Sequence, residues 1–284
     1  MRGPLLPVRG PLLPAARSVL DESGPEVRVA LVSNDLIPLP STGRVYRAER
    51  RVRLGDTSPE GRLRFDSVAR YLQDVAEDDA EDAQWPASIG WLLRRCVVAV
   101  WRFPSRTERL ELATFCSATA SRWAERTTTI RGDDGGLVQA KAIWVAVDAV
   151  SGRPQRLGEL FERVYRPSAG GKSASARLLL PGPPEFGLEP GRPWPVRASD
   201  IDIWGHMNNA VHWAAVEDAM SSLDWLPVRA ELEYNEPIVS QADPVLLRQE
   251  TPSVLDTWLL GGGRVLASAR LWRSPGSAGT RRDP

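Results

Sequence analysis

Apolar and polar residues alternate along the chain in two blocks of similar layout. Each block opens with an extended segment, continues with a helix-compatible stretch and ends with four β-rich runs. The predicted helices cover 65–77 and 209–222. The predicted strands are 96–103, 110–118, 123–130 and 137–147 in the first block, and 228–234, 244–250, 254–260 and 264–272 in the second. One strand, one helix and four strands, twice over, predict an α+β fold.

A constant offset of 144 positions relates the beginnings of the two blocks. It places Asp56 on Asp200, Gly61 on Gly205 and Asp74 on Asp218. In each block the aspartate and glycine of a predicted turn come shortly before the predicted helix. Internal similarity at a fixed offset indicates a duplicated unit.

The second predicted helix is apolar in almost every direction. Between positions 210 and 220 the exceptions are His212, Glu217 and Asp218. A helix that is apolar all round must be enclosed by the rest of the protein. Several strands curled around such a helix form a hot-dog arrangement, so we predict a tandem (double) hot dog, two antiparallel sheets each wrapped around a central helix. An open α+β sandwich is the alternative.

Proline and glycine mark the predicted domain boundaries. The motif RGPLLP occurs at 2–7 and again at 9–14, and proline and glycine cluster between 167 and 195. Such segments suit neither a regular helix nor a central strand. The predicted organisation is a disordered N-terminal extension over 1–42, a first hot-dog domain over 43–166, a linker over 167–190, a second hot-dog domain over 191–273 and a disordered tail over 274–284.

The composition narrows the functional classes. Hydrophobic residues make up 42% and charged residues 25% of the 284 positions, as in ordinary soluble globular proteins. The 36 basic and 36 acidic residues cancel, which argues against nucleic acid as a partner. No apolar run is long enough to cross a membrane. The only cysteines, Cys96 and Cys116, lack metal-ligand spacing, so we expect a cytoplasmic protein with no metal and no cofactor.

The candidate chemistry lies in the segment SDIDIWGHMNN at 199–209, directly before the enclosed helix. Asp202 supplies a carboxylate and His206 an imidazole, whereas Asn208 and Asn209 are residue types that begin helices. The helix N-terminus adds unpaired N–H groups and a positive dipole end, which would stabilise a developing oxyanion. Gly205 would let a substrate approach the backbone closely. The alternative interpretation is a plain turn and helix cap.

This segment resembles the active-site motif of the acyl-ACP thioesterases, bacterial relatives of the plant plastid enzymes. Further similar stretches are 52–61, 71–74, 124–127, 144–148 and 232–234. The resemblance implies that the second hot dog supplies the catalytic groups, with Asp202 and His206 as the catalytic aspartate and histidine. It also implies that the first hot dog mainly shapes the acyl pocket.

The sequence departs from the plant-type pattern at two places. Trp204 stands where that pattern has an asparagine. We predict that it binds substrate as a pocket wall, together with Gly205, Asn208 and Asn209, and a tryptophan packed in the core is the alternative for position 204. The plant enzymes also carry a Glu-Cys pair after a Glu-Tyr pair, but here the cysteine is absent. Glu236 matches the glutamate only if the alignment is shifted by one residue. A catalytic role is one interpretation of Glu236, and a solvated charge at a strand edge is the other.

These observations predict an enzyme that hydrolyses an acyl thioester and releases a free fatty acid, as in fatty acid biosynthesis. Asp202 would activate a water or attack directly to give a transient anhydride. The expected partner is acyl carrier protein, with acyl-CoA as another possible substrate and a homodimer as a possible assembly. A hot-dog enoyl-thioester hydratase and an inactive acyl-thioester-binding protein are the alternatives.

Two further assignments concern charged side chains. Glu217 and Asp218 on the second helix are assigned a structural role, such as holding the neighbouring strands, in preference to a catalytic one. Arg94 and Arg95 form part of a basic group of the first block that would dock an acidic carrier protein.

Overall fold

The computed structural model describes residues 36–274, and the predictions made for 1–35 and 275–284 lie outside the described residues. In the described part the strands form one antiparallel sheet in the order β1-β3-β4-β5-β2-β7-β10-β9-β8-β6. The strands of the first half are β1 (Tyr46–Arg51), β2 (Ile89–Arg102), β3 (Arg109–Thr119), β4 (Trp123–Gly132) and β5 (Leu137–Asp148). Those of the second half are β6 (Arg192–Pro193), β7 (Pro227–Tyr234), β8 (Val245–Glu250), β9 (Val254–Gly261) and β10 (Arg264–Arg273).

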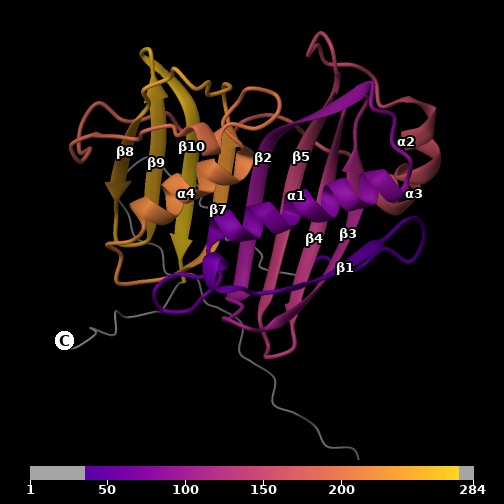
Figure 1. Ribbon diagram of the computed structural model, residues 1–284, viewed down its shortest axis with the longest axis horizontal. Helices are drawn as coiled ribbons and strands as arrows, with labels where there is room; N and C mark the ends of the chain where they lie inside the picture. Colours follow the sequence, from indigo (N-terminus) through magenta and orange to yellow (C-terminus); the bar gives the residue numbers. More distant parts are fainter. Residues whose placement is uncertain (1–35, 275–284) are drawn as a thin grey trace, which may run out of the picture. The chain divides into compact units, whose positions relative to one another are not determined.

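Two long helices cross the same face of this sheet (Figure 1). Helix α1 (Phe65–Asp82) and helix α4 (Asn209–Ala219) begin at the predicted positions, although α1 continues five residues beyond its predicted end. In α1 the side chains of Phe65, Val68, Leu72 and Val75 are buried. Their spacing of three or four residues gives the helix one apolar face, which packs on the sheet. Sequence analysis missed two short helices, α2 (Gly158–Val164) and α3 (Arg166–Ala169).

The two predicted sheets are the two halves of one continuous sheet. The halves have the same strand order read from opposite edges, and β2 and β7 occupy equivalent places. These two strands pair antiparallel, from Arg95 opposite Glu233 to Ala99 opposite Arg229. The two equivalent strands pair antiparallel in one sheet, and both helices lie on one face of it (Figure 1). The two halves are therefore related by a two-fold rotation about an axis perpendicular to the sheet. The fold is therefore the predicted tandem hot dog, closed by main-chain hydrogen bonds between its halves.

The segments that precede the two helices are equivalent in detail. Short 3-10 turns η1 (Leu54–Asp56) and η2 (Ala198–Asp200) lie 144 positions apart, as do the first residues of α1 and α4. Asp56 accepts a hydrogen bond from the N–H of Arg53, and Asp200 accepts one from the N–H of Arg197, both at 2.8 Å. The predicted duplication thus extends to individual hydrogen bonds.

The core runs through both halves beneath the helices. Phe65 of α1 and Trp213 of α4 are fully buried, and their ring centroids lie 5.5 Å apart. Small residues such as Ala230 of β7 let the sheet approach the helices closely. Because each helix packs on the other as well as on its own strands, the two halves share one hydrophobic core.

The linker and the end of the N-terminal extension lie against the sheet. Glu233 of β7 accepts hydrogen bonds from the N–H groups of Leu179 and Leu180, and the indole of Trp258 donates to the carbonyl of Pro181 at 2.9 Å. Residues 36–42 belong to the extension for which disorder was expected. In that segment the main chain of Ile37 exchanges two hydrogen bonds with the Gln139 amide, each 2.9 Å long, because that amide needs partners where it is buried.

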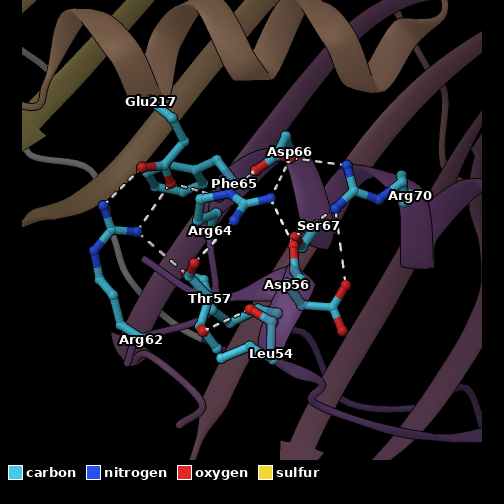
Figure 2. Close-up of polar contacts among 12 residues, drawn as sticks. Leu54, Asp56, Thr57, Arg62, Arg64, Phe65, Asp66, Ser67, Arg70 and Glu217 are labelled. Carbon is cyan, nitrogen blue, oxygen red and sulfur yellow. Dashed lines mark hydrogen bonds and ion pairs between the residues drawn. The ribbon is translucent and has the colours of Figure 1, made fainter. Parts of the chain in front are cut away.

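An ion pair joins the two halves at the start of α1 (Figure 2). Glu217 of α4 makes a two-pronged contact with Arg62, at 2.9 and 2.7 Å, and accepts the N–H of Phe65 at 2.6 Å. Both charged side chains are largely buried. Glu217 is structural, as predicted, but it caps the other helix instead of holding strands. The acceptor satisfies an N–H that the helix itself leaves unpaired.

Replacing Glu217 with alanine is expected to lower the free energy of unfolding by about 3 kcal/mol, because Arg62 would be left buried without its counter-ion. The measurement is urea denaturation of both proteins. The control is Asp218→Ala, which removes the neighbouring ion pair with Arg192. Both side chains of the Asp218–Arg192 ion pair are almost half exposed, so the loss of unfolding free energy should stay below about 1 kcal/mol. Equal losses in the two variants would contradict this assignment.

Candidate active site

The loop between η2 and α4 is closed by its own main chain. The N–H of Asp202 donates to the carbonyl of His206 at 2.8 Å, and the N–H of Gly205 donates back to the carbonyl of Asp202 at 3.0 Å. Gly205 has a φ of +77°, a backbone conformation that disfavours any residue with a side chain. The turn therefore needs glycine at this position, and it brings residues 202 and 206 side by side.

The Asp202 carboxylate is held in place by backbone N–H groups. Its Oδ1 atom accepts hydrogen bonds from Trp204 at 2.9 Å and from His206 at 3.4 Å. Its Oδ2 atom has no hydrogen-bond partner among residues 36–274, and the residue is half-buried. One carboxylate oxygen is thus fixed in orientation, whereas the other is available to a water or a substrate.

His206 is anchored by its main chain, and its imidazole makes no hydrogen bond within the described part of the chain. Its main chain forms a bridge with Val239, and the N–H of the next residue, Met207, donates to the carbonyl of Ile238 at 2.7 Å. The ring is half-buried beside the turn. A fixed backbone with uncommitted ring nitrogens is suited to positioning a water or contacting a substrate carbonyl.

The start of α4 completes the group. Asn208 is the N-cap, and its side-chain oxygen accepts the N–H of Ala210 at 2.9 Å. The N–H of Asn209 donates to no described residue. The Tyr234 hydroxyl donates to the carbonyl of Asn209 at 3.3 Å and accepts the indole N–H of Trp213 at 3.1 Å. The helix start is therefore rigid and keeps a free donor at its positive dipole end.

His212 is a buried residue near the site to which sequence analysis gave no role. Its Nδ1 atom lies 3.2 Å from the carbonyl of Asn208, and its ring packs edge-on against Tyr234 at 5.0 Å. Burial lowers the pKa of His212 to about 4, so the ring is neutral near pH 7. It borders a small gap between α4 and the second-half strands, with room for about one water molecule. The gap is lined also by Ala215, Val216, Leu232, Leu246, Thr257, Leu259, Ala267, Ser268 and Ala269. A lone histidine on an apolar helix face was its only sequence signal.

The side chains of two predicted site residues make no hydrogen bond with Asp202 or His206 in the described part of the chain. Glu236 forms an ion pair with Arg264 at 2.8 Å, and no hydrogen bond joins it to Asp202 or His206. Trp204 is 59% exposed at the tip of the loop, beside the 93% exposed Ile203, and so lies outside the core. Catalysis by Glu236 and substrate binding by Trp204 therefore stay predictions.

The two arginines assigned to carrier docking hold main-chain carbonyls. Arg94 donates to Tyr234 at 2.8 Å and to Asn235 at 3.1 Å, and Arg95 donates to Arg177 at 3.1 Å. Both side chains thus have structural partners within the protein, which leaves them less suited to an acidic carrier protein than their sequence positions indicated.

The equivalent position in the first half is closed. At the offset of 144, Ser58 stands in the place of Asp202 and Arg62 in the place of His206. Arg62 is occupied by its ion pair with Glu217, and the same carboxylate caps the start of α1. This half has neither a free acid nor a free helix start, so the chain holds one open site of this kind in its described part.

Sequence and structure comparisons point to one group of proteins. Residues 43–165 match the model of the acyl-ACP thioesterase N-terminal domain, and residues 190–245 match that of the C-terminal domain. The chain is 30% identical over 242 residues to the uncharacterized protein Rv2001 of Mycobacterium tuberculosis, covering 84% of this chain and 96% of that protein.

Two solved structures share the fold. The acyl-ACP thioesterase from Bacteroides thetaiotaomicron has a TM-score of 0.66 at 15% identity and covers 81% of this chain and 98% of its own. The 12:0-ACP thioesterase from Umbellularia californica has a TM-score of 0.66 at 17% identity and covers 81% and 97%.

The tandem hot dog and its family matches define a thioester hydrolase. Within that class the chain belongs to the acyl-ACP thioesterase family, whose two domain models together cover most of the chain. Over residues 36–274, no helix has both the length and the apolar character that a membrane span requires.

The buried His212 should make the protein less stable in mild acid. The unfolded state takes up a proton near pH 6.5, whereas the folded state resists it until about pH 4. The free energy of unfolding should therefore fall as the pH drops through this window, by about 2 kcal/mol between pH 6.5 and pH 5. Urea denaturation at both pH values should show a smaller fall for His212→Leu than for the wild type. The same fall in both proteins would contradict this role.

Proposed function

We propose that this protein hydrolyses acyl-ACP to a free fatty acid, with Asp202 as the general base. The observation that carries the proposal is the free Oδ2 atom of a carboxylate fixed by the turn that presents His206. The Asn209 N–H at the start of α4 adds a free donor. A carboxylate, an imidazole and an N–H donor on one turn and the helix start that follows it are the groups that attack on an activated carbonyl requires.

The reaction would proceed through one tetrahedral intermediate. Asp202 takes a proton from a water as the water oxygen bonds to the thioester carbonyl carbon. The carbonyl oxygen becomes negative and is stabilised by the Asn209 N–H and the positive end of α4. The intermediate then collapses, the carbon–sulfur bond breaks, and the proton on Asp202 passes to the departing thiolate. The products are a fatty acid and the carrier thiol, and Asp202 is again ionised.

Membership of the family supports acyl carrier protein as the carrier to which the acyl group of the substrate is attached. The gap beside α4 has mainly apolar walls close to the start of the helix. We infer that this gap widens to receive the first part of the acyl chain, because His212 at its edge contacts the helix-cap residue Asn208.

Asp202→Asn is expected to reduce kcat by about three orders of magnitude, because the amide cannot accept the proton from water. Thiol release from octanoyl-, lauroyl- and palmitoyl-ACP, and from the matching acyl-CoAs, measures this directly. The matched control is Asp218→Asn, which changes an exposed aspartate on α4 and should leave kcat unchanged. Normal hydrolysis by Asp202→Asn would reject Asp202 as the base.

The same assay separates the alternatives. Water addition to an enoyl-ACP without thiol release would indicate a hydratase, and acyl-ACP binding without turnover would indicate a carrier. Glu236→Gln tests the remaining catalytic candidate. Its ion pair with Arg264 favours a small effect on kcat, and a loss comparable to that of Asp202→Asn would instead place Glu236 in the reaction.

A further inference from the structure

The contacts at the closed site of the first half indicate which residue of α1 is equivalent to Glu217 at the open site of the second half. At the start of α1, Glu217 contacts Arg62 and the N–H of Phe65 (Figure 2). The offset of 144 positions relates Arg62 to His206 and Phe65 to Asn209. The same offset relates Glu217 to Gln73, which lies on α1.

The symmetry of the sheet means that residues related by the offset of 144 positions also occupy equivalent places in space. Because β2 and β7 are equivalent strands paired antiparallel, the rotation that exchanges the halves also exchanges the two helices. The symmetry therefore predicts a counterpart of the Glu217 contact, in which Gln73 lies beside His206 and the start of α4. Matching bridges before each helix, Thr57 with Leu63 and Ile201 with Met207, show that the symmetry holds at these loops.

The polar groups at the start of α4 differ from those at the start of α1 in one respect, which is that they have no hydrogen-bond partners in the described part of the chain. The Oε1 atom of Gln73 is buried and has no hydrogen-bond partner. The Asn209 N–H and the His206 ring are also without partners in the described part of the chain. Buried amide oxygens are normally satisfied, and an exception calls for a missing partner such as a water or a ligand. Glu217 closes the first site, whereas Gln73 leaves the second one open.

We propose that Gln73 is a positioning residue of the active site, contributed by the first half to the catalytic second half. Its Oε1 atom accepts a hydrogen bond from the attacking water and directs that water toward the thioester carbonyl, while Asp202 removes the proton. An amide suits this place because it stays neutral. A carboxylate there would attract His206 and take the free Asn209 N–H, as Glu217 does with Arg62 and Phe65. This inference rests on the thioesterase function proposed above.

The first test is Gln73→Leu, assayed by thiol release from lauroyl-ACP. Loss of one hydrogen bond to the reacting water should lower kcat about tenfold and leave KM nearly unchanged. Thermal unfolding of the same preparation separates a catalytic loss from a folding loss. A wild-type kcat in Gln73→Leu overturns the proposal.

The second test is Gln73→Glu, which keeps the size and shape of the side chain. Ionisation of the new carboxyl should close the site, so kcat/KM should decrease as the pH rises, a descending limb that the wild type lacks. A residue with only a structural role would not alter the pH profile. A Gln73→Glu profile parallel to that of the wild type overturns the proposal even if the activity is lower.

The matched control is Glu217→Gln, the same exchange in reverse at the equivalent place. It should reduce stability, because it weakens the pair with Arg62, but it should keep the shape of the wild-type pH profile. Wild-type and Asp202→Asn protein are assayed in parallel. An inactive wild type would contradict the proposed function itself, whereas an active wild type with unaffected Gln73 variants would reject only the role of Gln73.

Discussion

The antiparallel pairing of β2 with β7 is the constraint on which the rest of the structure depends. It joins two five-stranded halves into one sheet and relates them by a two-fold rotation. The rotation sets α1 and α4 against each other on one face, where Phe65 and Trp213 pack together. As a consequence, the start of α1 lies beside Glu217 of α4, and the rotation predicts Gln73 of α1 beside the start of α4.

Duplication gave the chain two such places, and different residues adapted them to different roles. In the first half a buried ion pair fills the space at the start of α1, with Arg62 as the cation and Glu217 as the anion and helix cap. In the second half the turn presents Asp202 and His206 with free polar atoms. Electrostatics explain the division, because a helix start attracts a negative charge. Glu217 supplies that charge permanently, whereas in the second half an oxyanion would supply it only during the reaction.

Neighbouring residues hold the main chain of this second site, and the buried His212 adds no charge to it. Asn208 caps the helix, and Tyr234 holds the carbonyl of Asn209 from behind. Burial keeps the His212 ring uncharged near pH 7, so this side chain places no positive charge beside the site. The small gap next to His212 is lined mainly by small and apolar side chains.

The sequence by itself determined the local parts of this protein. The apolar character of 210–220 in almost every direction predicted an enclosed helix, and the offset of 144 positions predicted equivalent halves. Asp200 and Gly205 predicted a turn before that helix. Only the tertiary structure decided which distant residues meet. Nothing local marks β2 and β7 as the strands that join the halves, assigns Glu236 to Arg264 or sets Glu217 against Phe65. The physical reason is that periodicity and turn chemistry act over a few residues, whereas these contacts depend on how the whole sheet is paired.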